Sequence, residues 1–169
     1  MFREYRLGAT KNSIDRAVAR ILADFGDVVN HGEEMLRFAY DLLPELVEGR
    51  HTWTIRYKPG GFRYPMSAGD KKNVLPVCID PDNDGNWERI GALSIPKMVV
   101  GYARDWPEKH KAISGSGWRS KAAMIDGMNE IYEPIYHREI GDCDILFAYK
   151  IEDFQLTPEF AEKYHRIFG

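Results

Sequence analysis

Two stretches near the start of the chain repeat apolar residues at helical spacing. In the first, apolar side chains from Ile14 to Phe25 fall on one face, and Gly26 follows as a stop. Ser13 stands just before this stretch, where its hydroxyl can cap the free amides of a helix start. In the second, an apolar stripe from Met35 to Leu46 ends before Gly49. The pattern therefore predicts two N-terminal helices.

The apolar spacing changes to alternation at residues 52–57, "TWTIRY", which is typical of a half-buried strand. Further strands are predicted by "MFREYRLG", "NVLPVCI", "WERIGALSI", "KMVVGYA" and "DILFAYKIEDF". Residues 58–72 are rich in glycine and proline, so we expect a long loop there.

Two later helices complete the predicted elements. A helical stripe runs from Ala122 to Ile135 after the loop "HKAISGSG", and Thr157 with Pro158 opens a last helix. Strands and helices do not alternate strictly, which favours an α+β fold with a mainly antiparallel sheet over a doubly wound one. A chain of 169 residues is the size of one domain, so we expect a single compact α+β domain over residues 1–169.

Composition narrows the class of protein. The chain is 44% hydrophobic and 29% charged, which is typical of a globular protein and excludes a disordered one. Its two cysteines, Cys78 and Cys143, are too few for a disulfide framework, and no secretory leader is recognisable. No apolar run reaches the roughly 20 residues of a membrane helix. We therefore expect a cytoplasmic protein with reduced thiols and no membrane contact.

Charge is segregated along the chain although the net charge is only -3. Residues 50–72 hold six basic residues against one acidic residue, and residues 101–121 hold five against two. Two basic segments therefore lie in an otherwise acidic chain. Such segments can form a positive patch that attracts phosphate, although mixed surface charge also serves solubility.

The second basic segment contains a candidate anion site in "ISGSGWRSKAA". A glycine and serine loop that runs into a helix start directs free amides and the positive helix end at one place, where an anion is stabilised. The predicted cradle consists of Ser114, Ser116, Gly117, Arg119 and Lys121. The alternative is a flexible linker in which Ser116 or Gly117 only caps the helix. The loop matches neither the Walker pattern nor the dinucleotide fingerprint.

The first basic segment offers outer charges for the same ligand: Arg56, Lys58 and Arg63. They are interleaved with aromatic residues, a mixture that lets rings stack on bases while cations hold phosphates. If 52–57 is a strand, its rings belong to the core, and Phe62, Arg63 and Tyr64 remain as exposed candidates. The alternative is a loop that merely covers the sheet.

The stretch "IDPDNDGNWE" resembles part of a calcium loop. Its possible ligands are Asp80, Asp82, Asp84 and Glu88. Gly85 supplies the sharp turn of such a loop, but Gly91 stands where the closing carboxylate belongs. Asp84 and Gly85 are also strong hairpin residues. We therefore expect chiefly a hairpin turn, with a weak divalent-cation site as the alternative.

Three functions are compatible with these features. The preferred one is binding of a phosphate-bearing ligand, either a nucleotide or a nucleic-acid backbone, by the two basic segments together. A second is a non-catalytic protein-binding factor or homo-oligomer, because the 21 aromatic residues include types that interfaces favour. A third is metal-assisted phosphoryl or phosphodiester chemistry, if the aspartates hold a cation next to the serine loop. No catalytic signature is present, which weighs against an enzyme.

Overall fold

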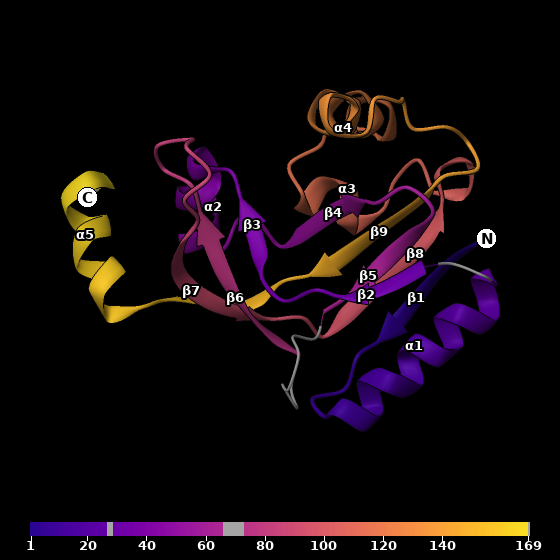
Figure 1. Ribbon diagram of the computed structural model, residues 1–169, viewed down its shortest axis with the longest axis horizontal. Helices are drawn as coiled ribbons and strands as arrows, with labels where there is room; N and C mark the ends of the chain where they lie inside the picture. The colour runs from indigo at the N-terminus through magenta and orange to yellow at the C-terminus, as the bar shows by residue number, and fades with distance from the viewer. Residues whose placement is uncertain (27–28, 66–72, 169) are drawn as a thin grey trace.

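The strands of the computed structural model, which describes residues 1–26, 29–65 and 73–168, form two four-stranded sheets and one strand pair (Figure 1). The first sheet has the order β1 (Phe2–Arg6), β8 (Lys97–Tyr102), β9 (Ile145–Lys150) and β4 (Trp53–Tyr57). The second has the order β10 (Glu152–Leu156), β7 (Glu88–Ser94), β6 (Val74–Ile79) and β3 (Leu36–Phe38). The pair joins β2 (Val29–Gly32) to β5 (Gly61–Tyr64). Pairing is antiparallel except in β3–β6 and β2–β5, so the predicted α+β class with mainly antiparallel strands is confirmed.

The first predicted helix is present as α1 (Lys11–Phe25). Its buried side chains recur at helical spacing: Ile14, Ala17, Val18, Ile21 and Phe25. The cap is Thr10 rather than Ser13: the Thr10 hydroxyl accepts from the Ser13 amide, and the Ser13 hydroxyl accepts from the Thr10 amide. Gly26 ends the helix at a φ of 74°, as the sequence predicted.

The second predicted helix is wrong over most of its length. Leu36 and Phe38 are buried by alternation in β3, which pairs in parallel with β6. A 3₁₀ turn, η1 (Tyr40–Leu42), follows, and only α2 (Leu43–Val47) is α-helical. Pro44 lies in the first turn of α2, where its missing amide costs no hydrogen bond, so it is compatible with the start of this short helix.

The loop predicted at residues 58–72 contains the strand β5, and residues 66–72 lie outside the described part of the chain. Phe62 is completely buried, which contradicts its prediction as an exposed ring. β5 pairs in parallel with β2, and this pairing places Phe62 in the core. The glycines and prolines around β5 are untypical of a strand, so the sequence predicted a loop there.

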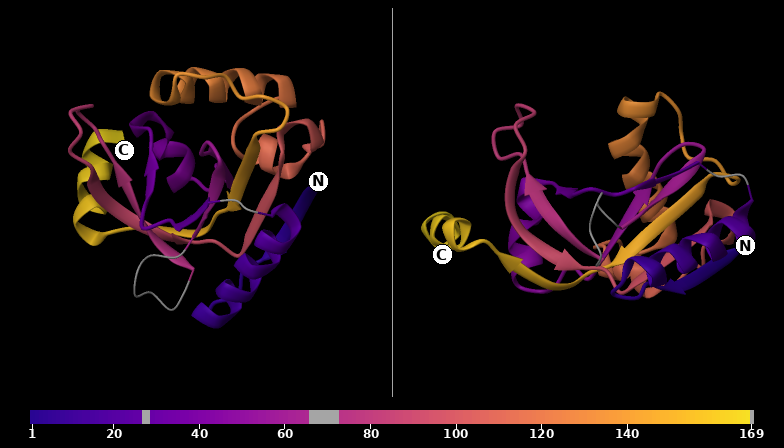
Figure 2. Two further views of the ribbon diagram at one scale, coloured as in Figure 1. Left: turned by 45° about the vertical axis from the view of Figure 1, so that its right-hand side comes forward. Right: turned by 60° about the horizontal axis from the view of Figure 1, so that its bottom comes forward.

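The first sheet separates two hydrophobic clusters. Phe147 and Tyr149 of β9 point into the larger cluster, which includes α1 and the second sheet, while Leu146 and Ala148 point into the smaller one. The smaller cluster also contains residues of α3 (Lys111–Gly115) and α4 (Lys121–Tyr136), which cover that face of the sheet (Figures 1 and 2). The stripe predicted between Ala122 and Ile135 forms α4, whereas α3 occupies part of a predicted loop.

The chain passes directly from the first sheet to the second at Ile151. This residue is buried between β9 and β10, so the segment predicted as one strand serves both sheets. The last helix, α5 (Pro158–Phe168), begins after Thr157 as predicted. It lies at the end of the molecule remote from α4 and α3 (Figures 1 and 2).

Candidate phosphate-binding site

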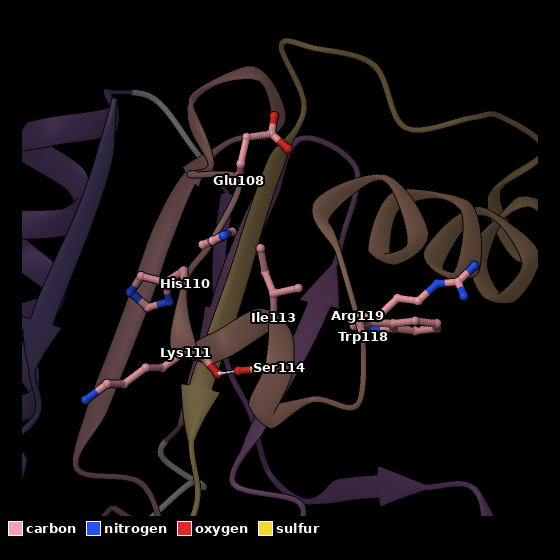
Figure 3. Close-up of a pocket in the computed structure, with 8 residues that line it drawn as sticks. Glu108, His110, Lys111, Ile113, Ser114, Trp118 and Arg119 are labelled. Atoms are coloured by element: carbon pink, nitrogen blue, oxygen red, sulfur yellow. Dashed lines mark hydrogen bonds between the residues drawn. The ribbon is translucent and has the colours of Figure 1, made fainter.

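A cavity of about 410 Å³ lies between α3, the segment before it and the α3–α4 connection (Figure 3). Its lining residues are Glu108, Lys109, His110, Lys111, Ile113, Ser114, Trp118 and Arg119. All of them come from a stretch of twelve residues around one short helix, 108–119. The placement of α3 on the sheet therefore determines the shape of this pocket.

α3 is held against the edge strand β4 by hydrogen bonds to backbone groups at the start of that strand. The Thr52 amide donates to the Gly115 carbonyl at 3.0 Å, and the Ser116 hydroxyl donates to the Trp53 carbonyl at 2.9 Å. Gly115 lies so close to Thr52 and Trp53 that a Cβ atom there would collide with both side chains. The glycine and serine of "SGSG" thus serve the docking of α3.

His110 begins α3 and forms one side of the pocket. Its Nδ1 accepts a hydrogen bond of 3.0 Å from the Ala112 amide, which caps the helix. Its ring meets the edges of Phe2 and Trp53 at centroid distances of 5.2 and 5.8 Å. Burial lowers the pKa of His110, which favours a neutral imidazole in this aromatic surrounding.

The rim of the pocket is positively charged. Lys109, Lys111 and Arg119 contribute three cations against the single carboxylate of Glu108. Figure 3 shows Lys111 and Arg119 extending to opposite sides, with Ile113 and Ser114 between them and Trp118 beside Arg119. The site therefore combines an apolar floor with exposed cations, an arrangement that suits a ligand with both an apolar part and negative charge.

The predicted anion cradle is only partly assembled. Ser114 and Arg119 line the pocket, whereas Ser116 is used to hold α3 to β4. Lys121 donates from Nζ to the Trp106 carbonyl at 2.7 Å and to the Arg104 carbonyl at 3.3 Å.

Gly117, the remaining residue of that cradle, and Ser120, which follows it in the same loop, both serve the backbone. Gly117 turns the chain at a φ of 90°. Ser120 caps α4 itself, since its hydroxyl accepts from the Ala123 amide, so one of the amides that were expected to attract an anion is already paired.

The other basic segment lies on the opposite face of the first sheet. Arg56 pairs with Phe147 across β4 and β9, and it therefore shares the face that points away from α3. Its guanidinium lies over the Phe38 ring at 5.1 Å and donates to the Arg37 carbonyl and the Thr54 hydroxyl. Arg56 is therefore not part of the pocket beside α3.

Lys58 and Arg63 gather near Glu33 on this other face. Arg63 Nη1 lies 3.8 Å from Glu33 Oε1. Burial, with Arg63 nearby, lowers the pKa of Lys58. The structure thus presents two basic surfaces on opposite faces of one sheet, and the α3 pocket draws on only the second basic segment.

The aspartate stretch forms the predicted turn of the β6–β7 hairpin. Asp80 accepts hydrogen bonds from the amides of Asp84 and Gly85, and Asp84 accepts from the amide and side chain of Asn86. These bonds to Asn86 lower the pKa of Asp84. Asn83 and Gly85 supply the positive φ values of 52° and 84°.

No group of three or more His, Cys, Asp or Glu side chains that could hold a metal ion occurs in the described parts of the chain. The carboxylates of Asp80 and Asp84 are directed to the turn, while Asp82 and Glu88 form no metal-binding group with them. A weak divalent-cation site at the hairpin stays a prediction of the sequence.

Sequence reasoning named only Ser114 and Arg119 among the pocket residues and missed the other six: Glu108, Lys109, His110, Lys111, Ile113 and Trp118. The signal that could have found the lysines was present, because they belong to the basic segment 101–121.

Within 1–26, 29–65 and 73–168, none of the helices combines the length and apolar composition that a membrane span requires. Comparison with protein-family models, curated proteins and solved structures found no match, so the function of this chain has to be inferred from its own geometry.

Proposed function

We propose that the protein binds a phosphate-bearing ligand with an aromatic ring, such as a nucleotide, in the pocket beside α3. The observation that carries this proposal is the cavity of about 410 Å³ with three cations at its rim and the Trp118 ring in its wall. Ligand pockets typically enclose about 300–1,000 Å³, so the cavity is large enough for a ligand of this class.

Each part of the ligand has a matching part of the pocket. Lys109, Lys111 and Arg119 supply charge-assisted donors for phosphate oxygens. The half-buried Trp118 ring and the Ile113 side chain offer apolar surface for a base. The Glu108 carboxylate repels negative charge at its side of the rim. This repulsion favours a ligand with one phosphate group over one with many.

The basic surface around Arg56, Lys58 and Arg63 lies on the opposite face of the first sheet, so it is a separate contact that only a longer ligand of the same chemistry could reach together with the pocket. A nucleic-acid strand would contact phosphates on this surface as well, whereas a mononucleotide would be confined to the α3 pocket. Neutralising the pocket residues is expected to abolish binding of both kinds of ligand. Neutralising Arg56, Lys58 and Arg63 is expected to weaken binding of a nucleic-acid strand alone.

Metal-assisted phosphoryl chemistry has no support from the arrangement of the two candidate sites. The hairpin that carries Asp80 and the helix α3 lie in separate parts of the molecule in each view (Figures 1 and 2). A cation at the hairpin would have to lie beside the ligand phosphate to act on it, since a metal bridge operates over a few ångströms.

The test is a titration with mononucleotides and single-stranded oligonucleotides at two salt concentrations. The pocket variant combines Lys109→Gln, Lys111→Gln and Arg119→Gln, and its matched control combines Lys11→Gln, Arg16→Gln and Arg20→Gln on α1. Both variants remove three exposed positive charges. A local site responds to the first variant alone, whereas a nonspecific effect of net charge responds to both.

A further inference from the structure

The apolar residues of α4 extend beyond the face of the helix that packs on the sheet, and Tyr132 and Tyr136 keep the last two turns in contact with Tyr57 of β4. Met124 and Met128 are buried, but the next members of the stripe, Ile131 and Ile135, are 54% and 59% exposed. These are the two most exposed large hydrophobic side chains among the described residues, and they lie one helical turn apart. Adjacent exposed apolar side chains of this size mark contact surfaces, so the pair is a candidate for one.

A shallow acidic cavity lies on the same helix. It has a volume of about 530 Å³ and is lined by Asn129, Glu130, Glu133, Pro134 and His137. The sequence from 122 to 136 contains three acidic residues and no Lys or Arg. The segment that covers Ile131 and Ile135 therefore has to be apolar in its centre and basic at its side.

α5 has these properties. Its first turn is anchored by the buried Phe160, while Ile167 in its last turn is 49% exposed. Exposed Lys163, His165 and Arg166 accompany Ile167. Arg166 pairs with Glu162 at 3.1 Å, but both side chains are about three-quarters exposed, and such a pair is worth little and is easily exchanged.

We propose that a second copy of this chain docks the last turn of its α5 against the exposed face of α4. Ile167 covers Ile131 and Ile135, and Arg166 lies beside Glu130. α5 and α4 lie at remote ends of the molecule (Figures 1 and 2), so the contact forms between copies rather than within one. Each copy offers both halves of the contact, so the contact joins two different surfaces, and it can close into a reciprocal dimer or repeat from copy to copy. This inference is independent of phosphate binding at α3.

Analytical ultracentrifugation of the full chain from micromolar to millimolar concentration tests the proposal. The weight-average mass is expected to rise with concentration. Ile131→Ser with Ile135→Ser, or Ile167→Ser alone, is expected to weaken association at least about tenfold, because central apolar contacts carry most of an interface's free energy. The matched control is Val74→Ser, which removes another exposed apolar side chain from β6 and leaves association unchanged. Circular dichroism confirms that each variant is folded.

Charge exchange tests the pairing of the helices. Glu130→Lys is expected to weaken association, and Arg166→Glu in the same chain is expected to restore it, because each contact then pairs the reversed charges. A monomer throughout the concentration range would overturn the proposal and leave the face of α4 to a different protein. Equal effects of the α4 and Val74 variants, or no recovery in the charge-exchanged chain, would also overturn it.

Discussion

The indole ring of Trp118 lies directly against Gly127 of α4, and there is no room for a Cβ atom between them. Trp118 also forms one wall of the pocket beside α3, and its amide donates to the Ile113 carbonyl at 3.0 Å. One ring thereby joins the pocket to the long helix. The absence of a side chain at Gly127 is a requirement of the candidate site.

Replacement of Gly127 tests this relationship. Gly127→Ala would gain about 1 kcal/mol of helix propensity at an open position, but the methyl group has to displace the ring, and overpacking costs about 1–3 kcal/mol. We expect no net gain or a loss of unfolding free energy in urea denaturation. In a Trp118→Ala background the same substitution is expected to stabilise the protein. A clear stabilisation of the chain that retains Trp118 would contradict the packing described.

His51 makes folding sensitive to acid. Its side chain is 5% exposed, and its Nδ1 lacks a hydrogen-bond partner among the described residues, with Glu45 Oε2 at 3.8 Å. Burial lowers the pKa of His51, Arg56 adds to the shift and Glu45 opposes it. The unfolded chain therefore binds the proton more readily than the folded chain. The stability present above the ordinary value of 6.5 is lost as pH falls toward the lower pKa of the folded state.

The measurement compares the unfolding free energies of wild type and His51→Gln between about pH 8 and pH 5, the range in which histidine titrates. The variant is expected to lose less stability on acidification than the wild type, although His110 retains part of the slope because its pKa is also lowered. Parallel profiles for wild type and His51→Gln would show that another group causes the effect.

The hairpin turn depends on Asp80 more than on its neighbour Asp82. The Asp80 carboxylate accepts the amides of Asp84 and Gly85, whereas the Asp82 side chain is exposed. Asp80→Ala is expected to lower the unfolding free energy by about 0.5–1.5 kcal/mol, the usual worth of such hydrogen bonds. Asp82→Ala is expected to remain within about 0.5 kcal/mol of wild type. Similar losses for both substitutions would mean that the turn is stabilised differently.

Local patterns were sufficient to predict α1, the hairpin and the buried face of β4. They failed at residues 35–46, where helical spacing and the alternation of Leu36 with Phe38 coexist. The pairing of β3 with β6, a strand some forty residues away in sequence, decides between them. Such a contact leaves no signal in the segment itself, and the same holds for Phe62 in β5.

The sequence was sufficient to predict the positive charge of the candidate site but not the arrangement of the side chains around the pocket. The basic segment 101–121 is evident in the sequence, and Arg119 and Ser114 were identified from it. The start of the helix that follows the serine loop was expected to hold the anion, yet the Ser120 hydroxyl already accepts from one of its amides, that of Ala123. The pocket instead depends on the docking of α3 against β4 at Gly115, which no local pattern reveals.

Isothermal titration of the protein with a mononucleotide at about 50 and 200 mM salt, a range over which phosphate contacts lose affinity, measures whether the α3 pocket binds phosphate. We predict saturable binding that weakens with salt, is lost in the Lys109→Gln, Lys111→Gln, Arg119→Gln variant and persists in the matched α1 control. Absence of saturable binding at low salt, or equal binding by the pocket variant and the α1 control, would contradict the proposed function.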